Sequence, residues 1–163
     1  MDSTVKVWAY RAPTTNDFPQ WSALYRGYRE FSQVAPDDSI VERVWSWIQD
    51  SEKETGALIS VADDGTIGGL AHYRRFDRPL SGTVGLYLDD LFTREDIRGQ
   101  GIARGLLNAL SEIAASEGLS VVRWITAADN ETARRLYDTE ATATQWVTYD
   151  KSPAHHALKH DSA

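Results

Sequence analysis

The chain has 163 residues, enough for one domain with a substantial core, and its hydrophobic fraction of 42% with six Trp indicates a packed globular protein rather than a disordered one. Its net charge of −7 and isoelectric point of about 5.0 argue against non-specific nucleic-acid binding and favour a cationic small molecule as partner. The sequence has no Cys, which excludes disulfides, thiolate metal sites and a cysteine nucleophile.

Neither a secretion signal nor a membrane span is recognisable in the sequence. No signal-peptide pattern opens the chain, and no apolar run approaches the roughly 18 residues that a spanning helix needs. We therefore expect a cytoplasmic protein that does not bind membranes.

A strand and a helix are predicted first. Val5 and Val7 alternate with polar residues, which predicts a strand over residues 4–11. From residue 18 to residue 34, apolar and aromatic side chains recur at helical spacing and form one stripe, so we expect a helix that packs into the core. The stripe consists of Trp21, Leu24, Tyr25, Tyr28 and Phe31.

A second helix and a β-hairpin follow. Either Asp38 or Ser39 is placed to cap a helix whose apolar residues extend from Ile40 to Ile48. Two strands are then expected over residues 56–63 and 66–73. An Asp-Gly pair separates them, which is a strong signal for a tight hairpin turn.

The middle of the chain is predicted to alternate between strands and a long helix. Residues 74–79 are polar and typical of a turn, and residues 85–93, an apolar run interrupted by two acids, predict a central strand. A helix is expected from Gly101 to the stop at Gly118, because its apolar residues recur at helical spacing. Residues 119–126 are rich in β-branched side chains, which predicts an interior strand.

The C-terminal part is predicted to contain one more helix and one more strand. Asp129 is placed to cap a short helix that runs to about Asp138, and residues 145–149 are typical of a last strand. We expect a single domain over residues 1–150 and a polar tail over residues 151–163. This order of elements predicts an α/β (α+β) fold in three layers with a mixed sheet.

The turn from Arg98 to Ala103 is suited to binding a pyrophosphate. The first turn of a helix has backbone N–H groups without partners and carries partial positive charge. Gly99 and Gly101 remove the side chains that would keep a phosphate at a distance. A dinucleotide fingerprint would need glycine where Arg104 stands, and the Gly-Lys-Ser/Thr of a P-loop is absent. A tight turn without a ligand is the alternative.

Three segments resemble the GNAT superfamily of N-acetyltransferases, over about residues 4–149. The turn resembles the Arg/Gln-x-x-Gly-x-Gly/Ala segment that holds coenzyme A in that superfamily; it consists of Arg98, Gly99, Gln100, Gly101, Ile102 and Ala103. The strand that begins at Tyr87 reads Tyr-Leu-Asp-Asp-Leu-Phe, which is similar to the Tyr-Leu-Glu-Asp of the diamine acetyltransferase branch. Asn130 is followed seven residues later by Tyr137, as that branch expects.

The resemblance implies a fold and a cofactor. The fold would be the GNAT-type three-layer arrangement, whose mixed, mostly antiparallel central sheet has two splayed strands, here residues 85–93 and 119–126. A bulge in the first of these strands would free backbone groups for the pantetheine arm. The cofactor would be acetyl-CoA, held by the turn residues together with Leu91, Phe92, Thr93 and Asn130.

The resemblance also assigns roles in acetyl transfer from a thioester to an amine. This reaction needs an amine that has lost its proton, a stabilised oxyanion and an acid for the departing thiolate. By family position, Tyr137 is the acid, and Asp89 matches the Glu that withdraws the amine proton through water, with one methylene less. Asp90 would attract the cationic acceptor, and Tyr25 and Tyr28 would border its pocket. Because successive strand residues point to opposite faces, both acids can serve one site only if the strand is irregular.

The leading hypothesis is therefore an acetyl-CoA-dependent N-acetyltransferase that acts by direct attack of a small primary amine: a polyamine, a diamine or a lysine-like amino acid. One alternative is an acyltransferase of the same fold with a peptide or protein amine as acceptor. The other is a non-catalytic acyl-CoA sensor, against which Tyr137, Asp89 and Asn130 argue, since a pure binder needs only the turn. The six Trp and seven Tyr, and the dimers known in the related branch, favour a homodimer.

The histidines and the last loop complete the expectations. His72 lies in a predicted strand and is interpreted as structural. His156 and His160 have helical metal-ligand spacing without a third ligand nearby, so no metal site is expected. Many family members have a Gly-Phe pair after the helix that carries the tyrosine. The glycine is absent here, which leaves the shape of the acceptor pocket open.

Overall fold

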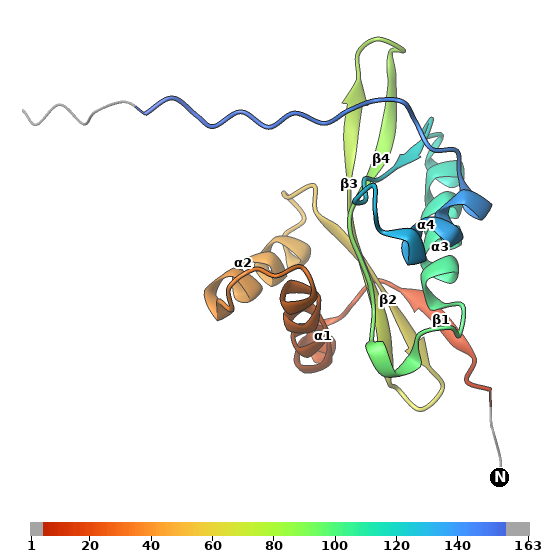
Figure 1. Ribbon diagram of the computed structural model, residues 1–163. Helices are drawn as coiled ribbons and strands as arrows, with labels where there is room; N and C mark the ends of the chain where they lie inside the picture. Colours follow the sequence, from red (N-terminus) through yellow and green to blue (C-terminus); the bar gives the residue numbers. More distant parts are fainter. Residues whose placement is uncertain (1–4, 156–163) are drawn as a thin grey trace, which may run out of the picture.

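Five strands form one sheet in the order β1-β2-β3-β4-β5 in the computed structural model, which describes residues 5–155 (Figure 1). The strands are β1 (Trp8–Arg11), β2 (Gly56–Ala62), β3 (Ile67–Arg78), β4 (Thr83–Thr93) and β5 (Val122–Arg123). The first four pair antiparallel with their neighbours, and β5 pairs parallel with β4. The mixed, mostly antiparallel sheet that we predicted is confirmed.

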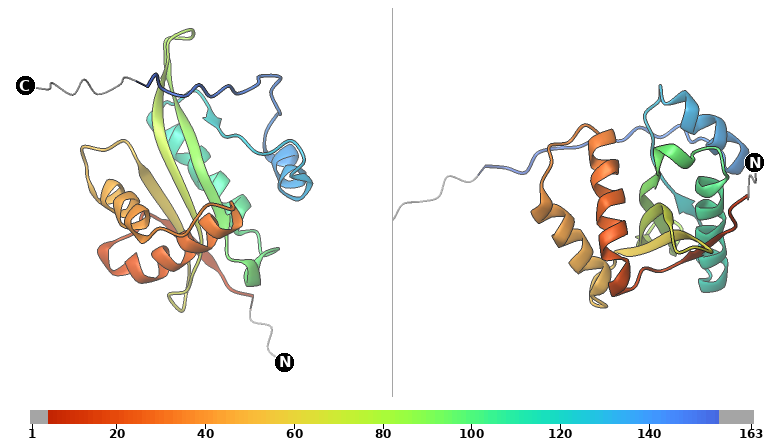
Figure 2. Two further views of the ribbon diagram at one scale, coloured as in Figure 1. Left: turned by 60° about the vertical axis from the view of Figure 1, so that its left-hand side comes forward. Right: turned by 90° about the horizontal axis from the view of Figure 1, so that it is seen from below.

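Helices cover both faces of this sheet, which confirms the three-layer fold (Figures 1 and 2). One face carries α1 (Phe18–Phe31) and α2 (Asp38–Gln49), and the other carries α3 (Ile102–Glu117), with α4 (Glu131–Glu140) beside α3. Two short 3₁₀ turns, η1 (Thr15–Asp17) and η2 (Glu95–Ile97), precede α1 and α3. No helix in residues 5–155 is long and apolar enough to cross a bilayer.

The core consists of two clusters, one on each face of the sheet. Adjacent residues of β2 alternate between them, so Leu58 packs with α3 and Ile59 packs with α1 and α2. Leu70 and Ala71 of β3 alternate in the same way. Because both faces are covered there, successive residues are buried along β2 and along the first half of β3, rather than every second residue.

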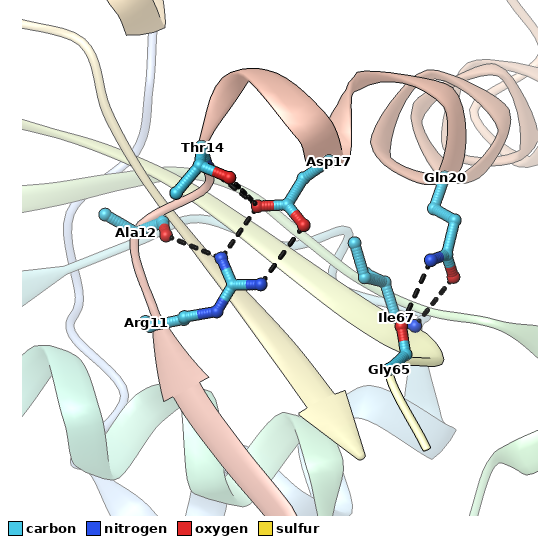
Figure 3. A network of polar contacts seen from close by, with 7 residues as sticks. All are labelled: Arg11, Ala12, Thr14, Asp17, Gln20, Gly65 and Ile67. Carbon is cyan, nitrogen blue, oxygen red and sulfur yellow. Dashed lines mark hydrogen bonds and ion pairs between the residues drawn. The ribbon is translucent and has the colours of Figure 1, made fainter. Parts of the chain in front are cut away.

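A partly buried ion pair links the end of β1 to the start of α1 (Figure 3). The guanidinium of Arg11 donates to both carboxylate oxygens of Asp17, at 2.7 and 3.1 Å, and the backbone N–H of Thr14 donates to the same carboxylate at 2.7 Å. Arg11 first, and then Thr14, lower the pKa of Asp17 to about 2. These contacts orient α1 on the sheet, and the side chain of Gln20 adds hydrogen bonds to the backbone of the β2–β3 turn.

The predicted turn at residues 74–79 is wrong, because β3 continues to Arg78 and pairs with β4 as one long hairpin. Its polar side chains have partners across the hairpin. Arg74 pairs with Asp89, and the ring of Phe76 packs edge-on against Tyr87 at 5.8 Å. Cross-strand pairs of this kind stabilise a solvent-exposed hairpin that the local sequence does not indicate.

Helix boundaries differ from the expectations by one to three residues. Asp37, rather than Asp38 or Ser39, caps α2, since its side chain accepts from the backbone N–H of Ser39 at 2.9 Å. Asn130, rather than Asp129, caps α4. The first helix ends at Phe31 instead of residue 34. The first strand begins at Trp8, and its predicted start, residue 4, lies outside the described residues.

Two predictions for the C-terminal part are wrong. Residues 119–126 do not form an interior strand: only Val122 and Arg123 pair, with Leu86 and Tyr87, and β5 is an edge of the sheet among the described residues. Residues 145–149 are in no strand of the described part, and every residue from 141 to 155 is exposed. Beyond Tyr87, β4 continues to Thr93 without pairing with β5, as expected for the splayed central strands.

Candidate active site

A β-bulge lies at Asp89, in the middle of the central strand. Asp90 is opposite His72 in the β3–β4 register, and the next pair is Leu88 with Tyr73, so Asp89 is an extra residue without a partner. A bulge of this kind changes the direction of the side chains beside it. The irregularity that would allow Asp89 and Asp90 to serve one site is therefore present.

Asp90 is held by a buried hydrogen-bond chain that crosses from the sheet into α1. One oxygen of its carboxylate lies 2.8 Å from Nδ1 of His72, whose side chain is only 2% exposed. The indole N–H of Trp21 donates to the other ring nitrogen, Nε2, at 3.1 Å. An indole N–H can only donate, so Nε2 is the acceptor and the imidazole proton is on Nδ1, where it is donated to Asp90.

Tyr25 and Tyr28 of α1 lie around this carboxylate. Their rings stack at 6.1 Å, and Tyr25 also packs edge-on against the ring of His72 at 5.0 Å. Burial, and next the charge of Asp90, raise the pKa of both tyrosines, so both are protonated at neutral pH. The structure thus brings together the three predicted substrate residues, Asp90, Tyr25 and Tyr28.

Asp89 has a different environment. Its carboxylate accepts from Nε of Arg74 at 3.1 and 3.3 Å, and the guanidinium of Arg74 lies over the ring of Tyr87 at 4.6 Å. The side chain of Asp89 is 38% exposed. Burial raises its pKa, the charge and hydrogen bond of Arg74 oppose that shift, and the neighbouring Asp90 adds to it. Asp89 is accordingly an accessible carboxylate with a higher proton affinity than an ordinary aspartate.

The N-terminus of α3 is open and carries no side-chain cap. Gly101 is the N-cap residue with φ 80°, and Gly99 has φ 83°, a left-handed conformation that favours glycine. A Cβ at either position would meet no protein atom within 4 Å, so the space in front of the helix is free. Ile102 is buried and anchors the first turn, whereas Gln100 is exposed. This arrangement fits a pyrophosphate group.

The strand that leads to this turn has one free edge. On its β3 side, β4 is paired as far as Thr93, but its pairing with β5 ends at Tyr87. Among the described residues, the backbone of Leu91, Phe92 and Thr93 therefore has no strand partner on the β5 side. Backbone amides along such an edge fit a ligand with amide groups of its own, as the pantetheine arm has.

A cavity of about 520 Å³ lies between α1 and the segment that contains η2. Arg98 forms part of its wall, and its guanidinium lies over the rings of Phe31 and Phe92 at 5.3 and 5.6 Å. Phe92 and Arg98 belong to the predicted site, whereas the contribution of α1 to this cavity was not predicted. The small residues Ala23 and Gly27, one helical turn apart, are the signal that could have indicated it. The cavity lining comprises Gln20, Ala23, Leu24, Gly27, Glu30, Phe31, Ile67, Phe92, Arg94, Glu95 and Arg98.

Tyr137 is on α4 and Asn130 is its N-cap residue, and neither residue lines the cavity. The ring of Tyr137 packs edge-on against Trp124 at 5.3 Å, and burial raises the pKa of its hydroxyl. The side chain of Asn130 accepts from the backbone N–H of Ala133 at 3.4 Å and donates to the hydroxyl of Thr126 at 3.3 Å. Capping is thus the role that the structure gives to Asn130.

An ion pair connects α4 to the glycine turn. Nε of Arg104, in the first turn of α3, lies 3.2 Å from the carboxylate of Glu140. This contact places the helix of Tyr137 beside the helix whose N-terminus forms the open turn.

No group of three or more His, Asp or Glu that could hold a metal ion occurs in residues 5–155. His156 and His160 lie outside the described residues.

The comparisons with known proteins give one family model and two N-acetyltransferases as relatives. The model of the acetyltransferase (GNAT) family matches residues 21–140. A D-amino-acid N-acetyltransferase of Saccharomyces cerevisiae is 27% identical over 143 residues, which cover 87% of this chain and 89% of that protein. A thialysine N-ε-acetyltransferase of Caenorhabditis elegans is 32% identical over 78 residues, 48% of this chain and 46% of that protein.

Solved structures show the same fold. A ribosomal-protein-alanine N-acetyltransferase from Brucella melitensis biovar Abortus 2308 superposes with a TM-score of 0.73 at 24% identity, over 90% of this chain and 99% of that one. An aminoglycoside N-acetyltransferase in complex with CoA superposes with a TM-score of 0.76 at 16% identity, over 94% and 100%. The family model spans most of the domain, including the bulged strand, the open glycine turn and α4. This chain therefore belongs to the acetyltransferase (GNAT) family.

Proposed function

We propose that this protein is an acetyl-CoA-dependent N-acetyltransferase whose acceptor is the primary amine of a small molecule. The observation that carries the proposal is the pair of carboxylates at the bulge of β4. One of them, Asp90, is held by a buried imidazole, and the other, Asp89, is accessible and has a raised pKa. Both lie on the strand that is followed, after η2, by the open N-terminus of α3. A binding module would need only the open turn.

Residues of β4 and of the glycine turn would hold acetyl-CoA. The first-turn N–H groups of α3 would bind the pyrophosphate, and Arg98 supplies a positive charge at the same turn. The free edge of β4 at Leu91, Phe92 and Thr93 would bind the pantetheine amides, and Asn130 stands at the start of α4. When bound, acetyl-CoA supplies the acetyl thioester and the thiol leaving group.

The acidic pair would prepare the amine. The carboxylate of Asp90 would bind the ammonium group of the acceptor, with Tyr25 and Tyr28 as the wall of the pocket. Asp89 would accept the amine proton, directly or through one water, because its carboxylate is accessible and its raised pKa brings it closer to the pH at which it must work. Tyr137, which burial keeps protonated, would donate its hydroxyl proton to the departing sulfur.

The names of the two sequence relatives favour an amino acid over a polyamine as acceptor, since they describe acetylation of a D-amino acid and of thialysine. We therefore propose a lysine-like amino acid as the first class to test, then diamines and polyamines. An acyltransferase with a peptide amine as acceptor is the second candidate.

We further propose a cytoplasmic location, where acetyl-CoA is available, and a homodimer as the functional unit.

A panel of amines tests the proposed function. Because the protein has no Cys, a thiol-reactive chromophore reports CoA release without background from the enzyme itself. The panel contains D- and L-lysine, other D-amino acids, putrescine, spermidine and a short peptide with a free N-terminus. Turnover with a free amino acid or a diamine is the expected result. Binding of acetyl-CoA without turnover on any amine would identify a sensor and overturn the proposal.

A further inference from the structure

The β3–β4 hairpin, which projects past α1 and α2 (Figure 1), carries an arginine next to the buried imidazole of the candidate site. His72 and Arg74 are two positions apart on β3, so their side chains lie on the same face of the sheet. The rings of Trp21 and Tyr25 pack against His72, so this is the face that α1 covers. The cover ends between the two residues, because the side chain of His72 is 2% exposed and that of Arg74 is 44% exposed. A ligand on this face can therefore reach Arg74.

The bulge of β4 brings both carboxylates of the site to the same face. Asp90 lies 2.8 Å from the ring of His72, and Asp89 accepts from Nε of Arg74 at 3.1 and 3.3 Å. In a regular strand one of these two neighbouring acids would point to the opposite face. The two carboxylates and the guanidinium thus form one group of charges, two negative and one positive, beside the tyrosines of α1.

Arg74 uses only one of its nitrogens in this group. Among residues 5–155, its two terminal nitrogens make no hydrogen bond to the protein. Other arginines of the chain form their ion pairs through two nitrogens. Arg75, the next residue, contacts both oxygens of Glu117 in this way, and Arg94 contacts both oxygens of Asp96. The contact of Arg74 with the protein therefore leaves the planar end of its guanidinium available.

The orientation of this guanidinium is nevertheless fixed. Its Nε is bonded to Asp89, and its central carbon lies 4.6 Å from the centre of the ring of Tyr87. A guanidinium that is held through Nε and through its face keeps its terminal N–H groups for a further acceptor. Two such groups match the two oxygens of a carboxylate, which is the anion that arginine binds most specifically in this geometry.

We propose that Arg74 binds the carboxylate of the acceptor, and that the acceptor is an amino acid whose reacting amine is adjacent to that carboxylate. This assignment rests on the proposed function, in which Asp90 binds the ammonium group. An α-amino acid fits both contacts at once, because its two charged groups are attached to one carbon and Arg74 is in direct contact with the neighbouring Asp89. A lysine-like amino acid would accordingly react at its α-amine, since its ε-amine is separated from the carboxylate by the whole side chain.

The same arginine would discriminate against diamines and polyamines. Two carboxylates alone would attract a ligand with several ammonium groups. The positive charge of Arg74 repels a second ammonium group and attracts a carboxylate, so it acts against one class of acceptor and in favour of the other. Arg74 is therefore a specificity-determining residue as well as a binding residue in this proposal.

Three matched acceptors test the role of Arg74. Lysine carries a carboxylate, lysinamide carries a neutral amide in its place, and cadaverine lacks the group. The wild type should have its highest kcat/KM with lysine, in whichever enantiomer reacts faster, and the product should carry the acetyl group on the α-nitrogen. Arg74→Gln should lower the lysine-to-lysinamide ratio of kcat/KM by on the order of 10- to 100-fold, as expected for lost hydrogen bonds to a charged group. Arg74→Lys, which keeps the charge, should retain part of the preference, and Arg74→Glu should favour cadaverine.

A control and a binding measurement separate this role from the stability of the hairpin. Arg75→Gln removes the same charge from the next residue, on the opposite face, and should keep the preference for lysine. Calorimetric titration of lysine and of lysinamide into the CoA-saturated protein measures the preference without chemistry. A lack of turnover on every amine would thus refute the proposed function and still leave Arg74 tested. Equal binding of lysine and lysinamide by the wild type, an unchanged preference in Arg74→Gln, or acetylation of lysine at its ε-nitrogen would overturn the proposal.

Discussion

Asp89 and Asp90 are neighbours in the chain, yet the structure gives them opposite environments. Asp89 is exposed and pairs with a surface arginine. Asp90 instead accepts the last hydrogen bond of the buried chain that runs from Trp21 through His72. The bulge produces this difference, because it moves the two side chains out of the strict alternation of a strand. A fixed carboxylate suits recognition of a cation, and an accessible carboxylate suits proton transfer.

The first prediction concerns His72, which we expect to position Asp90. His72→Phe removes the Nδ1–H donor and should raise the KM of the acceptor amine about tenfold, as expected for one hydrogen bond to a charged group. The KM of acetyl-CoA should stay unchanged, because the glycine turn is not affected. Steady-state kinetics with each substrate varied in turn checks this, and His155→Phe, at an exposed position, is the control. Equal changes in both KM values would indicate a general loss of structure instead.

The second prediction concerns the pH dependence of the reaction. Asp89 acts as a base only when it is ionised, and burial raises its pKa, so the acidic limb of the rate profile should lie above the range of an ordinary aspartate. Asp89→Asn should lose most activity at low pH, where the neutral amine is rare. The loss should shrink as pH approaches the acceptor's own pKa near 10. Rate profiles of the wild type, of this variant and of Asp77→Asn, at an exposed site, check the prediction. A uniform loss at every pH would assign Asp89 to positioning.

The third prediction concerns Tyr137. Tyr137→Phe should lower turnover by on the order of 10²–10⁴ while acetyl-CoA affinity remains nearly intact, because the proton donor matters mainly in the transition state. Tyr73→Phe is a matched control, since Tyr73 is also half-buried, packs on the same core cluster and has a pKa raised by burial. If acetyl transfer is rate-limiting and Tyr137→Phe keeps full turnover, Tyr137 contributes only to packing and is not the acid.

At the scale of elements, the fourth prediction concerns the open turn before α3. Gly101→Val places a branched side chain at φ 80° in the space in front of the helix and should abolish acetyl-CoA binding. Gly82→Val introduces comparable backbone strain, at φ 63° in the β3–β4 turn, without approaching the site. Calorimetric titration of both variants, after circular dichroism has shown that they fold, separates strain from loss of the ligand space. Unchanged affinity in a folded Gly101→Val would show that the pyrophosphate site is elsewhere.

Elements with a strong local pattern were predictable from the sequence. The stripes of α1, α2 and α3 and the Asp-Gly turn between β2 and β3 are determined by residues close together in the chain, and the structure confirms them. The outer half of β3 was not predictable, because its polar residues are stabilised by partners on β4. The same holds for β5, whose length depends on the divergence of two strands.

The features of the candidate site were predictable only where their sequence signals are local. The glycine spacing is local, so the turn was found, and the acids were found because charges inside an apolar run are unusual. The contact of Trp21 with His72 joins residues from two layers of the fold, 51 positions apart, and no local pattern indicates it. The cavity beside α1 was missed for the same reason, since it exists only where α1 meets η2.

At the scale of the whole molecule, the proposed site depends on the splay of the central sheet. The proposed acceptor residues on α1 lie on one face of the sheet, and Tyr137 is on a helix associated with the other face. Beyond Tyr87 β4 is not paired with β5, and we propose that a ligand contacts both groups through this gap.

The last prediction concerns the homodimer that we propose as the functional unit. If two copies associate, unfolding of the dimer also separates the chains, and the Tm must rise with protein concentration. For two chains of this length the rise should be on the order of 2 °C for each tenfold increase. Scanning calorimetry over about a hundredfold range of concentration measures this slope. A Tm that is constant over that range would mean that the protein unfolds as a monomer, and it would overturn the proposed dimer.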